Sequence, residues 1–199
     1  MKMVAYWKRV GACACVLSAM TLAQNGLALD LAGVKIEETA KVANQDLKLN
    51  GAGIRYKVIF KVYTAALYLA DKKTTTQDVL TAPGARRMEM VMLRDVSNED
   101  FGRAFMTGIK NNSDKTERAK IIAQLLAFGE TFASIPELRK GDVIFIDWIP
   151  GVGTQIHINS KLVWETTPDQ TFYNILLRTW LGDKPADNNL KSLLLGQSG

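Results

Sequence analysis

An arginine at the start of an alternating apolar stretch is the residue best suited to chemistry in this sequence. The segment Leu49 to Leu69 reads LNGAGIRYKVIFKVYTAALYL, and Arg55 follows the Gly51-Ala52-Gly53 triplet closely. Even positions from Ile54 to Val62 are apolar or aromatic, so spacing alone places Arg55 on the opposite, solvated face. The alternative is an arginine at the polar end of a cavity. That arrangement needs an anionic partner, such as a carboxylate or phenolate ligand, because an unpaired buried charge costs several kcal/mol.

The glycine triplet does not have the pattern of a dinucleotide-binding loop. Such a loop needs a third glycine and a helix that begins directly after it. Here Gly53 is followed by Ile54-Arg55-Tyr56 and an alternating, strand-like run. We expect the glycines to let the backbone turn tightly into that strand.

The remaining polar residues suggest neither a metal site nor a cofactor. His157 is the only histidine, and it shares its strand parity with the polar residues Gln155 and Asn159. We therefore expect it on a solvated sheet face. Asp142 and Asp147 stand around one predicted strand, as separated carboxylates on exposed sheet edges often do. H-E-x-x-H, G-x-S-x-G and P-loop motifs are absent from the sequence.

Aromatic and methionine side chains have two readings. Trp148, Trp164 and Trp180 are expected to be core or surface-anchoring aromatics. Met88, Met90 and Met92 alternate on one strand face, as ordinary core residues would. The alternative is that these methionines form a soft, adaptable wall for an apolar ligand.

Residues with a period of two predict the strands that would position these side chains. Asn50-Gly51 is a turn signal, and Ile54 to Leu69 is expected to form one long strand after it. The last three predicted strands are joined by short turns, which indicates an antiparallel meander. The other predicted strands are Val34–Ile36, Arg87–Leu93, Val143–Ile149, Thr154–Ile158 and Lys161–Trp164.

Helices are predicted between and after these strands. Ser97 to Asp100 resembles a capping box that opens a helix, and a second helix carries Leu125, Phe128 and Phe132 on its inner stripe. A third helix is expected to begin with Thr167 as N-cap and to run to Leu181, and a short one covers residues 188–195. The order of strands, helices, strands and helix predicts an α+β fold, an antiparallel sheet with helices packed on one face.

The N-terminus has the pattern of a secretory signal peptide. Lys2, Lys8 and Arg9 precede an apolar run from Val10 to Ala23, and small residues follow at Gly26-Leu27-Ala28. The apolar run is about 14 residues, short of the roughly 20 that span a bilayer, which disfavours a retained membrane anchor. We expect residues 1–28 to be the signal peptide and residues 29–199 to be one domain. The protein would then be exported, and periplasmic in a bacterium.

Removal of that segment changes the composition. Cys13 and Cys15 are the only cysteines, so the remaining domain would have no disulfide, zinc–thiolate site or cysteine nucleophile. Three of the 25 basic residues also leave, so 22 basic residues face 20 acidic ones and the net charge falls from +5 to +2. The adjacent pairs Arg86-Arg87 and Arg139-Lys140 are expected to be solvated strand ends. Nucleic-acid binding is disfavoured, because it needs a clustered basic face, and no stable membrane insertion is expected after cleavage.

The stretch GAGIRY followed by KVYTAALYL resembles the chalcone isomerase-like family, whose plant members carry G-A-G-x-R and then K-F-T-A-x-x-x-Y-L. The similarity extends to the helix Glu117 to Phe132, to Lys140-Gly141 and to the segment from Thr179 to Gly182. The Trp-Leu-Gly ending and the Leu-Leu-Leu-Gly tail resemble most the bacterial exported branch. The resemblance implies an open-faced β-sandwich, a large antiparallel sheet covered by helices with a cleft between them.

The resemblance also implies roles for particular residues. Arg55 matches an arginine that stabilises the anionic oxygen as a phenol adds across an enone. Lys61 sets the register of a threonine that orients water with a tyrosine, and that position is Tyr63 here, with Thr64 next to it. Thr179 matches a late threonine on the last long helix.

One family helix departs from the plant pattern. It supplies a tyrosine and a lysine in plants, whereas here it begins NEDFGRAF. Phe101 and Arg103 occupy the nearest positions, and Phe105 lies on the same inner stripe as Phe101. Arg55 can supply electrostatic stabilisation, but the water-orienting network that serves as general acid and base is not evident.

We therefore predict a noncatalytic, exported binder of a small amphiphilic or aromatic anion, fatty-acid-like or flavonoid-like, anchored by Arg55. An intramolecular lyase of the chalcone–flavanone type, with Arg55, Tyr63 and Thr179 as catalytic residues, is the alternative. A structural or envelope-interaction protein with a vestigial cleft is the third hypothesis. The predicted ligand-binding residues are Arg55, Tyr63, Thr64, Phe101, Phe105 and Thr179.

Overall fold

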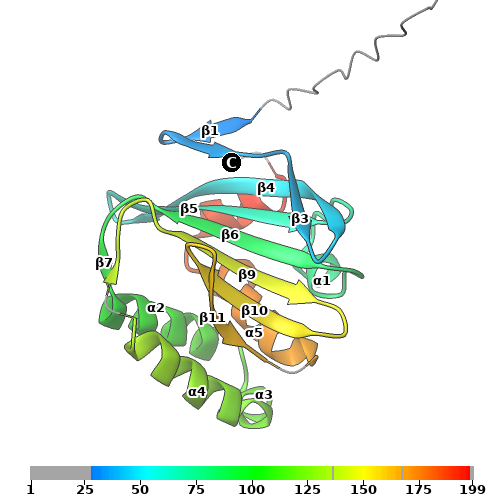
Figure 1. Cartoon of the computed structure of the whole chain (residues 1–199), viewed down its shortest axis with the longest axis vertical. Coiled ribbons are helices and arrows are strands. Elements are labelled where there is room, and N and C mark those ends of the chain that lie inside the picture. Colours follow the sequence, from blue (N-terminus) through cyan, green and yellow to red (C-terminus); the bar gives the residue numbers. More distant parts are fainter. Residues whose placement is uncertain (1–27, 136, 167, 198–199) are drawn as a thin grey trace, which may run out of the picture.

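The computed structural model describes residues 28–135, 137–166 and 168–197 and shows a curled, seven-stranded antiparallel sheet (Figure 1). The strand order across the sheet is β11-β10-β9-β6-β5-β4-β3. Two small two-stranded sheets, β1-β2 and β7-β8, accompany it. The strands are β1 (Leu29–Leu31), β2 (Val34–Ile36), β3 (Thr39–Val42), β4 (Gln45–Lys57), β5 (Phe60–Leu69), β6 (Arg86–Met92), β7 (Val96–Ser97), β8 (Glu137–Leu138), β9 (Val143–Ile149), β10 (Gly153–Ile158) and β11 (Lys161–Glu165).

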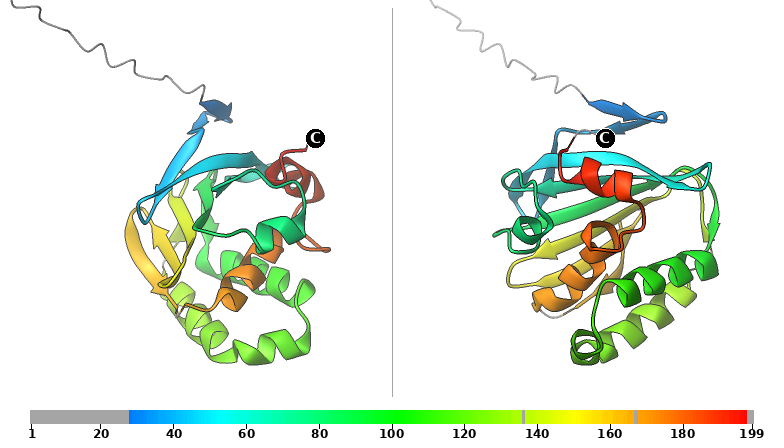
Figure 2. Two further views of the ribbon diagram at one scale, coloured as in Figure 1. Left: turned by 90° about the vertical axis from the view of Figure 1, so that its right-hand side faces the viewer. Right: turned by 180° about the vertical axis from the view of Figure 1, so that it is seen from behind.

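The helices gather on one side of the sheet, and the β1-β2 hairpin lies on the other side (Figure 2). This arrangement confirms the predicted α+β class. α5 packs on the sheet and contacts α2, while α6 lies across β4. The helices are α1 (Thr76–Leu80), α2 (Asn98–Asn111), α3 (Lys115–Lys120), α4 (Ile122–Ala133), α5 (Gln170–Leu181) and α6 (Asn188–Leu194). None of the helices in the described part of the chain has the length and apolarity to cross a membrane.

The main hydrophobic core lies between the sheet and the helices. Met88, Met90 and Met92 on β6 are buried in it, so the methionines are core residues. A smaller cluster occupies the opposite sheet face, beneath the N-terminal strands. Its buried members are Ile36, Val42, Leu47, Ala66, Tyr68 and Ala85.

The stretch expected to form one strand after residue 54 is instead a hairpin. β4 ends at Lys57, Val58 and Ile59 form a two-residue turn, and β5 runs back antiparallel from Phe60. Tyr56, Val58 and Phe60 are consequently exposed, although their spacing predicted a buried face. The prediction was wrong because neither turn position carries the glycine or asparagine that usually marks a two-residue hairpin.

The predicted turn at Asn50-Gly51 is also wrong, because both residues lie within β4. The β4–β5 register shifts between Leu49 and Gly51, as at a β-bulge. The Asn50 side chain donates to the carbonyls of Lys73 and Leu194, and its Oδ1 accepts the Lys73 N–H at 2.6 Å. The glycines therefore do not introduce the strand; they allow α6 to lie close against it.

The predicted helices are present, with two differences at their ends. The second predicted helix divides at Ile121 into α3 and α4. The third begins at Gln170 with Asp169 as its N-cap, whose side chain accepts the Thr171 N–H; the predicted cap, Thr167, lies outside the described residues. The remaining meander strands and the short last helix lie where the sequence predicts them.

Neither residue of the pair Arg86-Arg87 is solvent-exposed, contrary to the prediction. Arg86 is fully buried, and its Nη1 donates to the carbonyls of Val79 and Leu80 at the end of α1. Arg87 forms a two-bond ion pair with the buried Asp147 on β9, with N–O distances of 2.7 Å. The sequence prediction was wrong because the start of β6 is covered on both faces. Arg86 packs against α1 and α5 on one face, and Arg87 forms its ion pair on the other.

Candidate functional site

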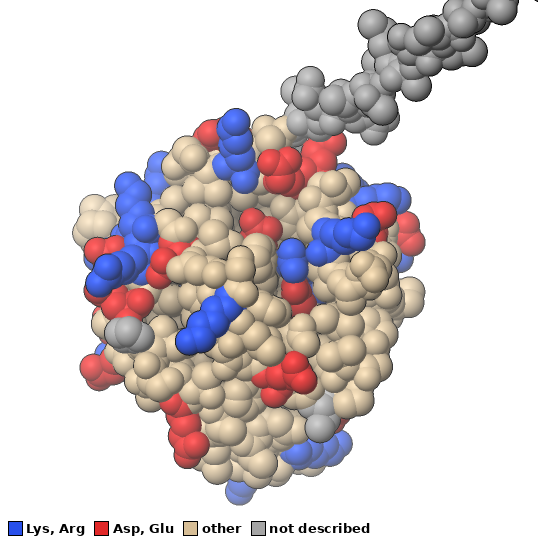
Figure 3. Space-filling model, in the orientation of Figure 1, with Lys and Arg blue, Asp and Glu red and all other residues tan. Residues whose placement is uncertain are grey.

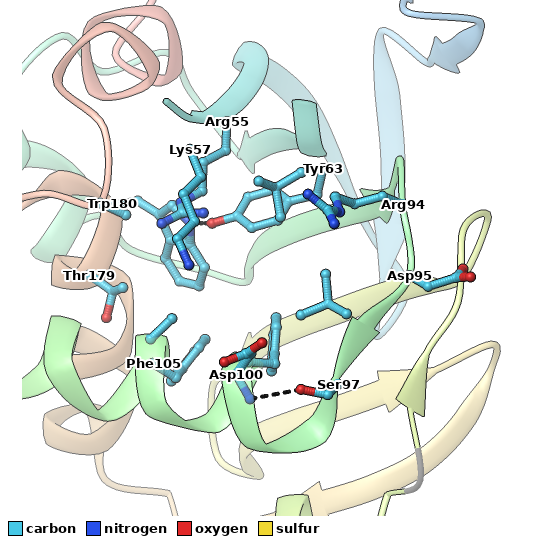
Figure 4. A pocket seen from close by; sticks show the side chains of 15 residues that line it. Arg55, Lys57, Tyr63, Arg94, Asp95, Ser97, Asp100, Phe105, Thr179 and Trp180 are labelled. Carbon is cyan, nitrogen blue, oxygen red and sulfur yellow. Dashed lines mark hydrogen bonds between the residues drawn. The ribbon is translucent and has the colours of Figure 1, made fainter. Parts of the chain in front are cut away.

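A cavity of about 270 Å³ opens between the sheet and α2. β4 and β5 supply one wall, α2 the second and α5 the third, and the β6–β7 connection closes one end (Figure 4). Residues far apart in the chain therefore meet here. The lining residues are Arg55, Lys57, Val62, Tyr63, Arg94, Asp95, Val96, Ser97, Asp100, Phe101, Ala104, Phe105, Thr179, Trp180 and Ala186.

Arg55 lines this cavity and is half-buried. Its guanidinium lies 5.6 Å from the centroid of the Tyr63 ring, within the range of a cation–π contact. Among the described residues, no carboxylate lies within ion-pair distance of Arg55, and its guanidinium donates no hydrogen bond. The arginine is thus oriented by an aromatic face while its donors stay available.

Tyr63 is held from the opposite side by α5. Its hydroxyl accepts the Trp180 Nε1–H at 2.9 Å, and both side chains are buried. Burial raises the pKa of Tyr63 above its usual value, although Arg55 and the Trp180 hydrogen bond act in the opposite direction. A phenol with a raised pKa keeps its proton at neutral pH, so Tyr63 can donate a hydrogen bond there but cannot act as a general base.

Thr179 also lines the cavity, one residue before Trp180. Its hydroxyl is buried and has no hydrogen-bond partner among the residues that the structure describes. α2 approaches it closely, because a Cβ on Gly108 would lie 2.4 Å from Thr179 Cγ2. Gly108 therefore sets the distance between α2 and α5 beside the cavity.

The structure brings together five of the six residues predicted to bind ligand. Arg55, Tyr63, Phe101, Phe105 and Thr179 line one cavity. Thr64 does not, because successive residues of a strand point to opposite faces and its neighbour Tyr63 points inward. Arg103, the other residue near Phe101, does not line this cavity; it pairs with Glu99 and Asp100 on α2 and lines a neighbouring hollow that shares Arg55.

An aromatic cluster forms the apolar wall. Phe101 and Phe105 lie with their ring centroids 5.7 Å apart, and Phe105 packs edge-on against Trp180 at 5.5 Å. Phe128 and Phe132 on α4 support them from behind. These contacts stiffen the helical side of the cavity, which suits a flat or aliphatic ligand surface.

The rim of the cavity is charged. Lys57 and Arg94 are exposed cations, and neither forms an ion pair with a described residue. Asp100 lies on the α2 side, where its backbone N–H bonds Ser97 Oγ and its carboxylate is 3.4 Å from Arg103. The cations at the opening, Arg55, Lys57 and Arg94, are therefore unpaired among the described residues, although Asp95 and Asp100 also line the cavity. Across the face shown in Figure 3, by contrast, side chains of both charges are scattered around a large neutral area.

The sequence analysis missed several lining residues. Lys57, Arg94 and Asp95 lie next to turns and carried no motif, while Val62 was assigned to an ordinary buried face. Trp180 was predicted as a core aromatic, and nothing in the spacing indicated its bond to Tyr63. The other residues weighed for chemistry, His157, Asp142 and Asp147, do not line the cavity. No cluster of potential metal ligands occurs within the described residues.

Comparison with known proteins agrees with this architecture. The sequence profile of a family described as chalcone isomerase-like matches residues 28–196. A search of curated protein sequences finds no match. A solved structure, the fatty-acid binding protein AtFAP1 of Arabidopsis thaliana, superposes with a TM-score of 0.66 at 16% identity, covering 82% of this chain and 92% of that one. At this identity the likeness concerns the fold.

The chain belongs to the chalcone isomerase-like family, as the resemblance of the GAGIRY stretch suggested.

Proposed function

We propose that this protein is a noncatalytic binder of a small amphiphilic anion, with Arg55 as the anchor for the anionic group. The observation that carries the proposal is the environment of Arg55: a guanidinium without an ion-pair partner among the described residues, directed at a cavity with aromatic walls. A carboxylate would accept charge-assisted hydrogen bonds from Arg55. The apolar part of the ligand would lie against Phe101, Phe105 and Val62.

The volume of the cavity limits the ligand. About 270 Å³ lies just below the usual range for ligand pockets, roughly 300–1,000 Å³. Medium-chain fatty acids and one- or two-ring aromatic acids suit this space better than long-chain acids. Seven buried CH₂ groups, at roughly 0.8 kcal/mol each, would contribute about 5–6 kcal/mol before ordering costs.

The similarity to the fatty-acid binding protein AtFAP1 supports the binder over the enzyme. Tyr63 supports it too, because its raised pKa keeps the phenol protonated at neutral pH and therefore unable to accept a proton as a general base. The binding role nevertheless depends on Arg55, and it is tested there.

The test is titration of the Arg55→Gln variant with octanoate, decanoate and cinnamate, with octanol as an uncharged comparison. Hydrogen bonds to charged groups contribute about 1.5–3 kcal/mol, so we expect the acids to bind at least about tenfold more weakly. Octanol should change little. Arg139→Gln is the matched control, because Arg139 is exposed, unpaired among the described residues and outside the cavity. Equal affinities of wild type and Arg55→Gln for the acids would contradict the proposal.

Native mass spectrometry of the purified protein gives an independent check. A binder of this kind is expected to retain a small acid that Arg55→Gln loses. A protein that carries no small molecule and binds none of the probes would instead fit the third hypothesis, a structural or envelope-interaction role.

An intramolecular lyase of the chalcone–flavanone type is the second candidate, since Arg55 and Tyr63 lie side by side in the cavity. Arg55 would stabilise the phenolate oxygen that adds to the enone, and Tyr63 and Thr179 would complete the site. Incubation with a hydroxychalcone decides the question. An Arg55-dependent rate above the spontaneous cyclisation would favour the enzyme, and the spontaneous rate alone would exclude it for that substrate.

Export by a signal peptide of residues 1–28 is also part of the proposal. Residues 1–27 lie outside the described residues, and the described fold begins with β1 at Leu29. Fractionation of the native host, followed by N-terminal sequencing of the protein, tests it. A protein that starts after Ala28 and leaves the cytoplasm is expected. An intact N-terminus in the cytoplasmic fraction would contradict export.

A further inference from the structure

The turn between β4 and β5 presents large apolar side chains to solvent. Val58 is 89% exposed, Ile59 78% and Phe60 55%, the two turn residues being the most exposed large hydrophobic residues in the described part of the chain. Tyr56, opposite Lys61 across the hairpin, is also exposed. None of these side chains contributes to the two hydrophobic clusters of the fold. We call the four apolar residues Tyr56, Val58, Ile59 and Phe60 the hairpin tip.

The backbone of the tip makes this choice of residues costly. Val58 has φ +59°, a left-handed conformation that is a genuine outlier for a β-branched side chain. Glycine or asparagine usually occupies such a position in a two-residue hairpin turn. Val58 thus combines backbone strain with almost complete exposure, and neither benefits the folded chain. Its side chain is better explained by a contact outside the chain.

Three cations surround the apolar tip. Lys57 and Lys61 flank the turn on the two strands, and the Arg94 guanidinium lies 5.2 Å from the centroid of the Phe60 ring. None of the three forms an ion pair with a described residue. Three carboxylates lie nearby without pairing with these cations: Asp187 accepts the Tyr56 N–H at 3.2 Å, Asp95 accepts the Lys140 N–H, and Asp100 is paired with Arg103.

The tip lies beside the mouth of the cavity. Lys57 and Arg94 belong both to the cavity lining and to the basic flank of the tip. The right-hand view of Figure 2 shows the β4–β5 hairpin at the edge of the molecule, beyond the start of α2. A surface that contacts the tip would therefore also face the opening next to Arg55.

We propose that the hairpin tip docks reversibly on an anionic lipid surface. Val58 and Ile59 enter the boundary of the acyl region, Tyr56 and Phe60 lie at the interface, and Lys57, Lys61 and Arg94 meet anionic headgroups. This layering of aliphatic, aromatic and basic side chains matches the layers of a bilayer surface. The inference goes beyond ligand binding, and it would place the cavity mouth where amphiphilic anions dissolve.

A lipid surface suits the tip better than a protein partner. Stable protein interfaces bury roughly 1,200–2,000 Å² and need a complementary surface. The tip is a protrusion of a few side chains, too small for that but sufficient to enter a fluid interface. Its cations, which form no ion pair with a described residue, also complement anionic headgroups without requiring a fixed geometry.

The test is flotation with vesicles of phosphatidylcholine, with and without phosphatidylglycerol, using protein expressed from the full chain. Wild type is expected to float with the anionic vesicles and to be released by salt. Val58→Gly/Ile59→Asn should bind at least about tenfold more weakly, because two apolar side chains are lost. Lys57→Gln and Lys61→Gln should each weaken binding about fivefold. Any effect of the N-terminal segment is common to all variants.

Two features keep the experiment decisive. Val58→Gly/Ile59→Asn places glycine at the strained position, so the variant should unfold at the same temperature as wild type or a higher one. Ile122→Gln/Leu126→Gln is the matched control, because these residues on α4 are 54% and 62% exposed and lie outside the tip. The tip variant should also retain the ligand affinity of wild type in solution, so the proposal is separable from the role of Arg55.

Vesicle binding that is unchanged in the tip variant would overturn the proposal, as would binding that only the α4 variant loses. Self-association of the wild type without vesicles, abolished by Val58→Gly/Ile59→Asn, would show instead that the tip contacts a second copy of the chain. The proposal would be supported if vesicle binding is weakened in Val58→Gly/Ile59→Asn, Lys57→Gln and Lys61→Gln but not in the α4 control.

Discussion

Arg55 and Tyr63 are direct partners across the β4–β5 ladder, with the guanidinium 5.6 Å from the ring centroid. The β4–β5 register shifts immediately beyond this pair, between Arg55 and Tyr56, so that Val62 and Tyr63 both reach the cavity. The Tyr63 ring is fixed in turn by its bond from Trp180. The orientation of Arg55 therefore depends on residues from β4, β5 and α5 together.

Tyr63→Phe should lower the free energy of unfolding by about 1–3 kcal/mol. The substitution leaves the buried Trp180 Nε1–H without its acceptor, and an unsatisfied buried donor costs about that much. The ring remains beneath Arg55, so affinity for octanoate should stay within a few-fold of wild type. Urea denaturation and ligand titration measure the two effects. Tyr63→Leu, which removes the ring as well, should lower both the stability of the protein and its affinity for octanoate. Unchanged stability of Tyr63→Phe would contradict a structural role for this bond.

Gly108→Ala should destabilise the protein by about 1–3 kcal/mol through overpacking, since the new Cβ would lie 2.4 Å from Thr179 Cγ2. Thermal or urea denaturation measures the loss. Adding Thr179→Ala should recover much of it. Gly102→Ala in the same helix is the control, because nothing lies within 4 Å of its Cβ. That change should instead stabilise α2 by up to about 1 kcal/mol. Equal effects at the two glycines would show that α2 and α5 are farther apart than the structure places them.

Alanine variants of the two glycines in GAGIRY should differ in whether a second substitution restores their stability. A Cβ on Gly51 would lie 2.0 Å from the backbone oxygen of Leu193, whereas a Cβ on Gly53 would meet the Leu193 side chain at 2.7 Å. Both alanine variants should lose stability, at the upper end of about 1–3 kcal/mol or beyond for Gly51→Ala. Leu193→Ala should restore Gly53→Ala but not Gly51→Ala. Rescue of both variants, seen in urea denaturation, would place α6 farther from β4.

The elements that were predicted correctly are those in which the spacing of apolar residues marks one face that packs on the core. On α2, Phe101, Phe105 and Ile109 recur with a helical period and are the residues that this helix buries in the protein core. The meander strands from Val143 onward are separated by turns that contain glycine or asparagine. Local chemistry was enough to predict these elements.

The prediction failed at the Val58-Ile59 hairpin because local chemistry was misleading there. Its apolar turn residues carry no turn signal, so β4 and β5 read as one strand. Asn50-Gly51 carried a turn signal but forms a bulge, because Asn50 bonds to segments far away in the chain. The cavity residues also divide into those that could be predicted and those that could not. The family resemblance predicted Arg55 and Thr179 as site residues. Lys57, Arg94 and Trp180 reach the cavity only through tertiary packing, which no local pattern indicates.

The stability of the protein should respond to the ionisation of Glu89 on β6. Burial raises the pKa of this carboxyl; Arg87 opposes the shift, and Asp147 and Glu37 add to it. Among the described residues Glu89 has no ion pair and accepts no hydrogen bond. Because the folded pKa exceeds that of the unfolded chain, about 4.3, the unfolded state loses its proton first as the pH rises. This group therefore lowers stability as the pH climbs from the unfolded pKa through the folded one, and the loss persists above it.

Glu89→Gln removes that ionisation, so the variant should be more stable than wild type at neutral pH. The difference should shrink as the pH falls through about 4.3 and should be small near about pH 3, where the wild-type carboxyl is largely protonated in both states. Urea denaturation across the acidic and neutral range measures this. Glu99→Gln is the control, since Glu99 is exposed and paired with Arg103 within one helix, a contact that contributes about 0.3–0.5 kcal/mol. A Glu89→Gln curve parallel to that of wild type would show that Glu89 ionises in the folded protein as it does in the unfolded chain.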